Sequence, residues 1–402
     1  MVMIVMTKKV VPKLQFNFSS EWNEKKLEQI IQISKEKYNP ESDKTNYKCI
    51  ELEHLSQETG LLLGCTDSIN QNSIKNKFHK ENILFGKLRP YLKKFYYTNF
   101  DGVCSSEIWV FNTQEYSKYI YYLIQTKKFF DLSNVSSGSK MPRSDWNFMK
   151  EYTFLIPDIR TQKETANLFS IIDNKISLLN KKYKLYQDFK KYLMQQIFTQ
   201  KLRFKDGENN LYPNWEPLHL KDIITLNGGY AFKSELFKDE GIPIIRISNI
   251  SQDNSVATND LVYYDKLKND QEFIIKKGEL IIAMSGATTG KVAVYDSEQI
   301  SYINQRVGLF KQISNKLYYP FLVQYSLSNN FKKELQKTLV AGAQPNISKK
   351  EIESFKIDLP NYEEQKKIAD LLHNIDLKIN TIKKQTFEFS EFKKSLLQQM
   401  FI

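Results

Sequence analysis

The stretch GATTGK, residues 286–291, has the glycines and the lysine of a loop that could bind the phosphates of ATP. A phosphate-binding loop of that class needs four residues between its glycines and a serine or threonine directly after its lysine. Here three residues separate Gly286 from Gly290, and Val292 follows Lys291. The spacing therefore disfavours an ATP site in this chain.

A second pattern has the carboxylates of a metal-dependent nuclease. Asp158 follows a proline and Asp173 opens the triplet DNK, which together make a loose PD…DxK motif. Carboxylates gathered in this way can hold Mg²⁺ and promote phosphodiester hydrolysis. The chain repeats itself 203 residues later, where Asn361 replaces Asp158 and Asp376 repeats Asp173. A nuclease is therefore the weaker alternative, and we expect Asp173 to be a solvated position on a helix.

Motifs of other enzyme classes do not occur in the sequence. It has no Asn-Pro-Pro-aromatic tetrapeptide of amino-group DNA methyltransferases, no glycine-rich S-adenosylmethionine loop, and no GxSxG or HExxH. Its three cysteines lack CxxC spacing and its four histidines are scattered, which disfavours a disulfide framework and a zinc site. We expect a non-catalytic chain with no metal or cofactor of its own.

The charge balance favours a polyanionic partner. The 402 residues include 58 Lys and Arg against 46 Asp and Glu, a formal net charge of +12 at pH 7. Such a surface attracts the phosphates of a polyanion such as nucleic acid. A coiled-coil adaptor that binds only protein is the alternative, because a basic composition alone does not identify a nucleic-acid partner.

No stretch of the sequence has the length and apolarity of a membrane span. An apolar run of 18 residues does not occur. The opening run MVMIVM has six residues and precedes its lysines, so it has neither the length nor the charge order of a secretion signal. We expect a cytoplasmic protein without a membrane partner.

The sequence contains a long internal repeat. Residues 157–198 align with residues 360–401 without a gap, and about 17 of the 42 aligned positions are identical. The closing stretches DFKKYLMQQIF (188–198) and EFKKSLLQQMF (391–401) show the similarity most clearly. A period of this length indicates a duplicated half-molecule, in contrast to the short periods of solenoid repeats.

Both copies of the repeat have apolar residues at alternating steps of four and three, and one lysine interrupts each row, Lys190 or Lys393. A sustained spacing of 3.5 residues predicts a coiled-coil helix, here of some 34 residues and roughly 50 Å. Neither helix can bury its row alone, so we expect the two to pack as one antiparallel pair; a helix packed on its own domain is the alternative. The seam includes Ile172, Ile176, Leu179, Leu193, Ile375, Ile379, Ile382 and Leu396.

The regions ahead of the two helices have the pattern of mixed α+β domains. Segments such as ELIIAMSGATTGKVAVY, residues 279–295, combine β-branched residues with glycines, which is typical of strands joined by turns. Residues 116–133 and 319–337 have helical spacing. The predicted segments are a first domain at 1–156, a helix and linker at 157–206, a second domain at 207–359 and a second helix at 360–402.

In their order along the chain, these elements resemble the specificity (S) subunit of a type I restriction–modification system. The resemblance covers essentially the whole chain, and it rests on the order of the motifs more than on any single one. The stretches that carry it are KLRPYLKK (87–94), VCSSEIWVF (103–111), GYAFKS (229–234), PIIRISNI (243–250), SGATTGKV (285–292) and INQRVGLF (303–310).

The resemblance implies an α+β fold with a pseudo-twofold internal repeat, in which two α/β-type target recognition domains are joined by two long helices packed as an antiparallel coiled coil. Each domain would read one half of a bipartite target in double-stranded DNA, and the helices would fix the unread gap. Two methyltransferase subunits and two restriction–translocase subunits would complete a complex for restriction and DNA methylation. S-adenosylmethionine, ATP and Mg²⁺ would belong to those partners.

DNA contacts are expected from loops that the two domains share. IELEHL (50–55) corresponds to IRISNI (245–250), and GKLRPYLKK (86–94) corresponds to SGATTGK (285–291). The candidates for contacts to base edges are Arg89, Arg246, Asn249, Gln305 and Arg306. The candidates for contacts to phosphates are Lys87, Lys93, Lys94, Lys140, Arg143 and Lys291.

Overall fold

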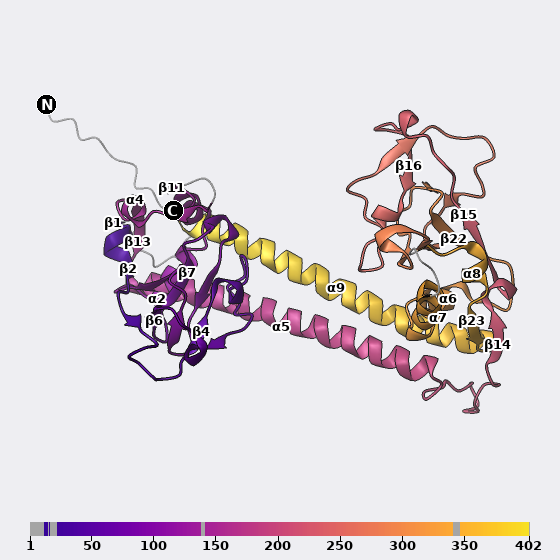
Figure 1. The fold of residues 1–402 in the computed structure, drawn as a ribbon, viewed down its shortest axis with the longest axis horizontal. Helices are drawn as coiled ribbons and strands as arrows, with labels where there is room; N and C mark the ends of the chain where they lie inside the picture. Colours follow the sequence, from indigo (N-terminus) through magenta and orange to yellow (C-terminus); the bar gives the residue numbers. More distant parts are fainter. Residues whose placement is uncertain (1–11, 15, 17–21, 138–140, 341–345, 402) are drawn as a thin grey trace. The chain divides into compact units, whose positions relative to one another are not determined.

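The computed structural model describes residues 12–14, 16, 22–137, 141–340 and 346–401. The chain forms two compact units, one of residues 1–181 with 383–402 and the other of residues 182–382. Each unit holds one globular part and half of each of two long helices (Figure 1). The units therefore differ from the four predicted segments, because each long helix is divided between them.

The long helices are α5 (Ile159–Phe198) and α9 (Tyr362–Met400), of 40 and 39 residues. Each is about 60 Å long at 1.5 Å per residue, about one and a half turns longer than predicted. The helix α5 begins early because Asp158 caps it: its Oδ1 accepts hydrogen bonds from the backbone N of Arg160 and Thr161 at 2.9 and 3.0 Å. It ends where Gln200 turns into the left-handed region at φ 57°.

In the first unit the two helix halves pack antiparallel. Asp173 on α5 pairs with Lys393 on α9 at 2.8 Å, and the rings of Phe169 and Phe401 lie 5.9 Å apart. A residue later in α5 therefore contacts a residue earlier in α9, as in an antiparallel pair. Asp173, predicted to be a solvated helix position, has a side chain that is 34% exposed, and its Oδ2 also accepts a 2.9 Å hydrogen bond from the hydroxyl of Tyr122.

In the second unit the other two helix halves pack in the same way. Lys190 on α5 pairs with Asp376 on α9 at 2.6 Å, and Ile197 lies in the same hydrophobic core as Ile368. All eight predicted seam residues are buried or half-buried, so the coiled-coil prediction is confirmed. Both lysines that interrupt the apolar rows have a carboxylate partner on the other helix.

The globular part of the first unit contains a four-stranded antiparallel sheet in the order β2-β10-β7-β8 and a five-stranded sheet in the order β3-β6-β9-β4-β5. The second sheet is mixed, because β4 runs parallel to β9. The bounds are β1 Trp22–Lys26, α1 Leu27–Ile30, β2 Gln32–Ile33, β3 Lys37–Tyr38, β4 Lys48–Ile50, η1 Leu52–His54, β5 Thr66–Asp67, η2 Ser68–Asn70, β6 Lys75–Phe78, β7 Ile83–Gly86, η3 Pro90–Leu92, β8 Phe95–Tyr97, β9 Gly102–Cys104, β10 Ile108–Asn112, α2 Ser117–Leu123, α3 Lys127–Ser133, β11 Ser136–Ser137, β12 Arg143–Ser144, α4 Trp146–Met149 and β13 Thr153–Pro157.

Alternation along β7 shows how this unit is layered. Ile83 and Phe85 join the core that also contains α2 and α3, whereas Leu84 joins Ile50 and Phe78 in a core between the two sheets. Successive side chains of a strand point to opposite faces. The four-stranded sheet is therefore the middle of three layers, with helices on one face and the second sheet on the other.

The second unit repeats this arrangement, with sheets in the orders β15-β22-β19-β20 and β17-β16-β21-β18 and with β16 parallel to β21. Leu280 and Ile282 face the helical core, and Ile281 faces the core between the sheets. The bounds are β14 Glu216–His219, η4 Leu220–Asp222, β15 Ile224–Gly228, η5 Ser234–Leu236, β16 Ile242–Ile245, η6 Ile247–Asn249, β17 Val262–Tyr264, β18 Ile274–Ile275, β19 Leu280–Ala283, η7 Gly286–Thr288, β20 Val292–Val294, β21 Ser301–Ile303, β22 Val307–Gln312, α6 Tyr319–Ser326, α7 Asn329–Val340, α8 Lys349–Glu353 and β23 Lys356–Leu359.

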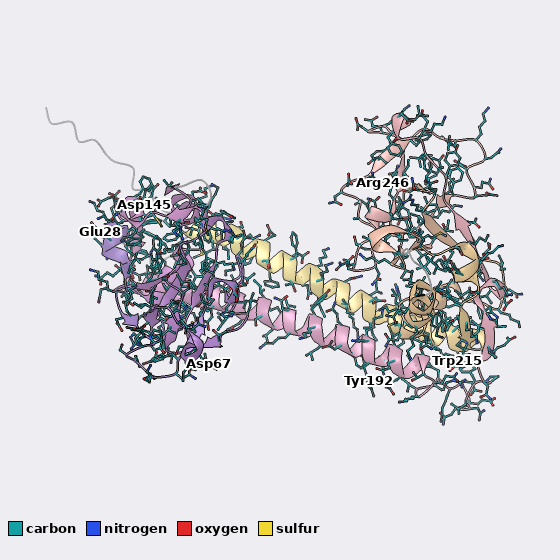
Figure 2. The ribbon with its side chains drawn as sticks, viewed as in Figure 1. Glu28, Asp67, Asp145, Tyr192, Trp215 and Arg246 are labelled. Atoms are coloured by element: carbon teal, nitrogen blue, oxygen red, sulfur yellow. The ribbon has the colours of Figure 1, made fainter. Side chains whose placement is uncertain are left out.

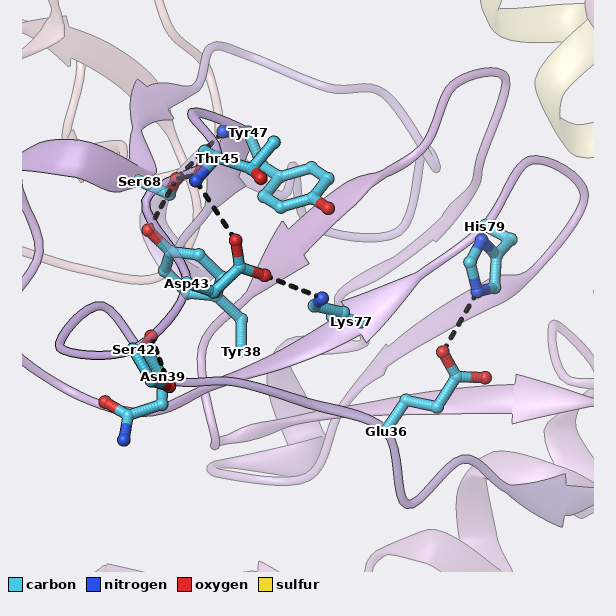
Figure 3. A network of polar contacts seen from close by, with 10 residues as sticks. All are labelled: Glu36, Tyr38, Asn39, Ser42, Asp43, Thr45, Tyr47, Ser68, Lys77 and His79. Carbon is cyan, nitrogen blue, oxygen red and sulfur yellow. Dashed lines mark hydrogen bonds and ion pairs between the residues drawn. The ribbon is translucent and has the colours of Figure 1, made fainter.

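The first unit has an additional edge strand, β3, in its five-stranded sheet. Figure 3 shows the polar network beside it, in which Lys77 of β6 binds Asp43 at 2.8 Å and His79 lies 3.1 Å from Glu36. The hydrogen bond from Lys77 lowers the pKa of Asp43 to about 2. The contact between Lys77 and Asp43 attaches the segment between β3 and β4 to the sheet.

The helical segments predicted at 116–133 and 319–337 are each two shorter helices, α2 with α3 and α6 with α7. In the first unit the break occurs at Thr126, whose hydroxyl accepts from the backbone N of Phe129 and starts a new helix. Continuous helical spacing in the sequence does not reveal such a corner, because residues of both helices are buried in the same core.

Candidate nucleic-acid interface

Three chain connections meet at one end of the second unit's middle sheet. They follow β16, β19 and β21, and hydrogen bonds join them. The backbone N of Asn304 donates to Ile245 O at 2.9 Å, the backbone N of Met284 donates to Arg306 O at 2.9 Å, and Thr288 Oγ1 donates to Ile247 O at 3.2 Å. These hydrogen bonds hold the three connections side by side at this end of the sheet.

The first unit has the same three connections after β4, β7 and β9. The backbone N of Ser105 donates to Ile50 O at 2.9 Å, and the backbone N of Lys87 donates to Glu107 O at 3.0 Å. Lys94 Nζ donates to Leu52 O at 2.6 Å and thereby joins the first two connections. A fourth segment, β12, lies alongside, where Ser144 N donates to Lys87 O at 2.9 Å.

Three predicted site residues of the second unit have side chains that are available for binding. Arg306 and Gln305 are exposed and Lys291 is half-buried, and none of them has a side-chain hydrogen bond or ion pair within the described residues. Tyr230 stands beside them, because its carbonyl accepts from Gln305 N at 2.9 Å, and its ring is exposed. The sequence reasoning did not select Tyr230.

Arg246 and Asn249 have internal roles. Arg246, labelled in Figure 2, donates from Nη2 to Asp260 O at 2.9 Å and to Asp260 Oδ2 at 3.1 Å. Asn249 is 2% exposed; its Oδ1 accepts from Arg246 N at 2.9 Å and its amide donates to Asp260 O at 3.1 Å. Since the side chain of Asn249 is enclosed and used, we do not retain it as a candidate for base contact.

In the first unit the predicted cations divide into two groups. Lys87 and Arg89 have no side-chain partner within the described residues, and Arg89 lies in the left-handed region at φ 53°. Lys93 pairs with Glu58 at 2.8 Å, and Lys94 is committed to a backbone carbonyl. Lys140 lies outside the described residues.

Arg143 is held by a carboxylate that the sequence reasoning missed. Its Nε and Nη2 donate to the two carboxylate oxygens of Glu107 at 3.0 Å each. This bidentate pair lowers the pKa of Glu107 and raises that of Arg143, so both groups are charged at neutral pH. Only the fold places them together, because β12 returns beside the β9–β10 connection.

The comparisons with known proteins agree with this geometry. The family model described as the type I restriction modification DNA specificity domain matches twice, at residues 19–185 and 212–388. The chain belongs to this family. Two consecutive specificity domains account for the internal repeat and for the paired sheets of the two units.

Individual members of the type I specificity family are similar over long stretches. The MjaVIII specificity subunit of Methanocaldococcus jannaschii is 29% identical over 289 residues, which are 69% of this chain and 68% of that protein. The crystal structure of an S subunit from M. genitalium covers 98% of this chain and 99% of its own, with a TM-score of 0.61 and 16% identity. A structure from a study of assembly and conformational transition of the type I R-M system has a TM-score of 0.56 and 16% identity, and covers 94% and 97% of the two chains.

The two apparent catalytic patterns have structural explanations in this specificity subunit. GATTGK is the turn between β19 and β20, where Gly290 at φ 81° donates its backbone N–H to Ala283 O at 2.8 Å. Asp158 caps α5 and Asp173 pairs with Lys393. These two carboxylates are fifteen residues apart on one helix, about 22 Å, and cannot bind the same ion. Within the described residues, no helix is long and apolar enough to span a membrane.

Proposed function

We propose that this chain gives a type I restriction–modification complex its DNA sequence specificity, with each globular part reading one half of a bipartite target. The observation that carries the proposal is the repeated set of three connections. Each unit presents unpaired basic side chains there, Lys87 and Arg89 in one and Lys291 and Arg306 in the other. Arginine can read base edges in the major groove, and lysine can neutralise phosphates.

The two halves of the target would differ in sequence. Where the second unit has Arg246 and Arg306, the first unit has Glu51 and Glu107 at the corresponding places after β4 and β9. Glu51 and Arg246 occupy the same position in matching caps, with His54 and Asn249 as the third residues of η1 and η6. The connections of the two units therefore carry different side chains, which supports two half-sites of different sequence.

The long helices would bind the methyltransferase subunits and set the unread gap. Phe189 on α5 and Phe392 on α9 are repeat partners, and they are 49% and 52% exposed. On α5 the exposed residues Ile171, Leu178, Leu185 and Tyr192 also recur every seven positions (Tyr192 is labelled in Figure 2). An aromatic residue exposed at the same place in both units suits two copies of one partner.

In this proposal the chain recognises DNA and its partners perform the chemistry. S-adenosylmethionine would bind the two methyltransferase subunits, and ATP and Mg²⁺ would serve the two restriction–translocase subunits. The roles found for Asp158, Asp173 and residues 286–291 support that division, because each of these groups completes the fold.

Sequencing of methylated bases in the host genome, with and without this gene, tests the proposal. Deletion should abolish methylation at one asymmetric motif made of two short halves and a gap of fixed length. Expression of the wild-type gene together with its methyltransferase partner should restore the motif. A methylome that is unchanged by deletion and by re-expression would contradict the proposed function.

A further inference from the structure

One position is supported by the same backbone hydrogen bonds in both units. In the first unit, Ile108 N donates to Ser105 O at 3.0 Å, and Glu107 O accepts from Lys87 N at 3.0 Å. In the second unit, Val307 N donates to Asn304 O at 2.8 Å, and Arg306 O accepts from Met284 N at 2.9 Å. Glu107 and Arg306 are therefore structural counterparts, each at the last turn residue before the central strand β10 or β22.

A guanidinium group is present at this position in both units, although it comes from different parts of the chain. In the second unit it belongs to Arg306 itself, which is exposed and has no side-chain partner within the described residues. In the first unit it belongs to Arg143 of β12, which Glu107 holds by two hydrogen bonds of 3.0 Å. The backbone bridge between Arg143 and Leu88 fixes the start of that side chain.

The pairing with Glu107 leaves part of the Arg143 guanidinium available. An arginine side chain has five N–H donors, and the carboxylate takes one from Nε and one from Nη2. Three donors remain, and the side chain is 45% exposed. A guanidinium that is already oriented loses less conformational freedom when it binds a flat hydrogen-bonding edge.

We propose that Arg306 and the Glu107-held Arg143 are specificity-determining groups at matched positions, each reading one guanine in its own half of the target. The inference rests on the proposed function and extends it to two base contacts and one positioning residue. Arginine donates two hydrogen bonds to O6 and N7 of guanine, an arrangement that no other base offers in the major groove. Glu107 acts through Arg143 by fixing its orientation.

The test compares methylomes of cells that express the methyltransferase partner with wild type, Arg306→Ala, Arg143→Ala, Glu107→Gln or Arg160→Ala. Arg306→Ala should remove the preference for one G·C pair in one half-site and leave the other half-site unchanged. Arg143→Ala should do the same in the other half-site, and Glu107→Gln should weaken the preference at that same base pair. Arg160, exposed in the first turn of α5 and outside the three connections, is the matched control and should leave the motif unchanged.

A second readout is the binding affinity of the purified wild-type and variant complexes for duplexes that differ at single base pairs. It also covers variants whose methylation is too weak for a motif to be detected. For Arg306→Ala and Arg143→Ala, the ratio of affinities for the G·C duplex and its substituted partner should fall about tenfold or more. A uniform loss of affinity with the ratio preserved would indicate a phosphate contact and overturn the inference. An unchanged motif, or lost preference at an A·T pair, would also overturn it. If the wild-type gene governs no bipartite motif, the proposed function itself fails.

Discussion

Lys190 on α5 donates from Nζ to both carboxylate oxygens of Asp376 on α9, at 2.6 Å each. The repeat partners of these residues, Lys393 and Asp173, make the same cross-helix pair in the other unit at 2.8 Å. Each lysine is almost buried, so each pair places a charge where the seam would otherwise be apolar. A buried charge tolerates only the alignment that supplies its partner, and it therefore favours one register of the helices.

Replacement of Lys190 by methionine should destabilise the second unit by about 2 kcal/mol, because Asp376 would keep its charge without the ammonium. The double variant Lys190→Met with Asp376→Leu should recover most of that loss. Denaturant unfolding of the wild type, the two single variants and the double variant measures the coupling free energy between Lys190 and Asp376. Lys366→Met is the control, because its pair with Glu363 is exposed and should contribute less than about 0.5 kcal/mol. A loss in the double variant equal to the sum of the two single-variant losses would show that the pair is not coupled.

Glu364→Ala should destabilise the second unit more strongly, by about 3–5 kcal/mol, because it leaves a buried guanidinium unpaired. Glu364 is fully buried and accepts from Arg203 at 2.8 and 2.9 Å and from Trp215 Nε1 at 3.1 Å. It joins the linker after α5 to the first turn of α9. Hydrogen exchange followed by mass spectrometry should show faster exchange in residues 201–225.

Glu363→Ala is the matched control for that variant. Glu363 precedes Glu364 on the same helix, and its side chain is 60% exposed. Exchange in residues 201–225 should stay at the wild-type rate. Similar acceleration in both variants would mean that the carboxylate of Glu364 has no special role.

Gly229→Ala should impair recognition by the second unit without a charge change. A Cβ atom there would lie 2.2 Å from Asn304 O and 2.3 Å from Ile303 O, so the backbone ahead of Gln305 and Arg306 must move. We expect at least tenfold weaker binding to the half-site that depends on Arg306. Gly228→Ala is the control, since its Cβ would have no heavy atom within 4 Å. Equal affinities of the two variants, measured by fluorescence anisotropy, would contradict the expectation.

We expect one methyltransferase subunit to be lost from the complex with either Phe189→Ser or Phe392→Ser. Each variant removes one of two exposed aromatic side chains that lie at matched places, Phe189 on α5 and Phe392 on α9. Native mass spectrometry should show complexes with one methyltransferase for either single variant and none for the double variant. Leu211→Ser, at an exposed leucine outside the helices, should keep both. Full occupancy in the double variant would exclude this surface as the docking site.

The sequence predicted those features that repeat along the chain. The heptad spacing identified both long helices, and the matched order of motifs identified the paired connections after β4 and β16 and after β7 and β19. What it missed depends on residues that only the fold brings together. Glu107 and Arg143 are 36 positions apart in the sequence, and Lys190 and Asp376 are 186 positions apart. Local sequence spacing therefore predicts neither pair.

Burial distinguishes candidate residues that the sequence alone does not. Asn249 and Arg306 are both polar residues beside strands, and their types alone suggest the same role. One side chain turns inward to complete a cap and the other stays exposed, a difference set by η6 and by the turn before β22. The ion pair of Asp173 was not predicted either, because its partner Lys393 lies 220 positions later in the sequence.

The division of both helices between the units has a consequence for synthesis on the ribosome. The second unit is continuous in sequence, so all of it is available once residue 382 has emerged. The core of the first unit includes Leu396, Leu397, Met400 and Phe401, and the ring of Phe401 lies 4.9 Å from that of Tyr119. The first unit is translated first, but its core cannot be completed until the end of α9 has been synthesised. Until then the apolar surface that α9 covers is exposed to solvent, and the first unit is completed after the second.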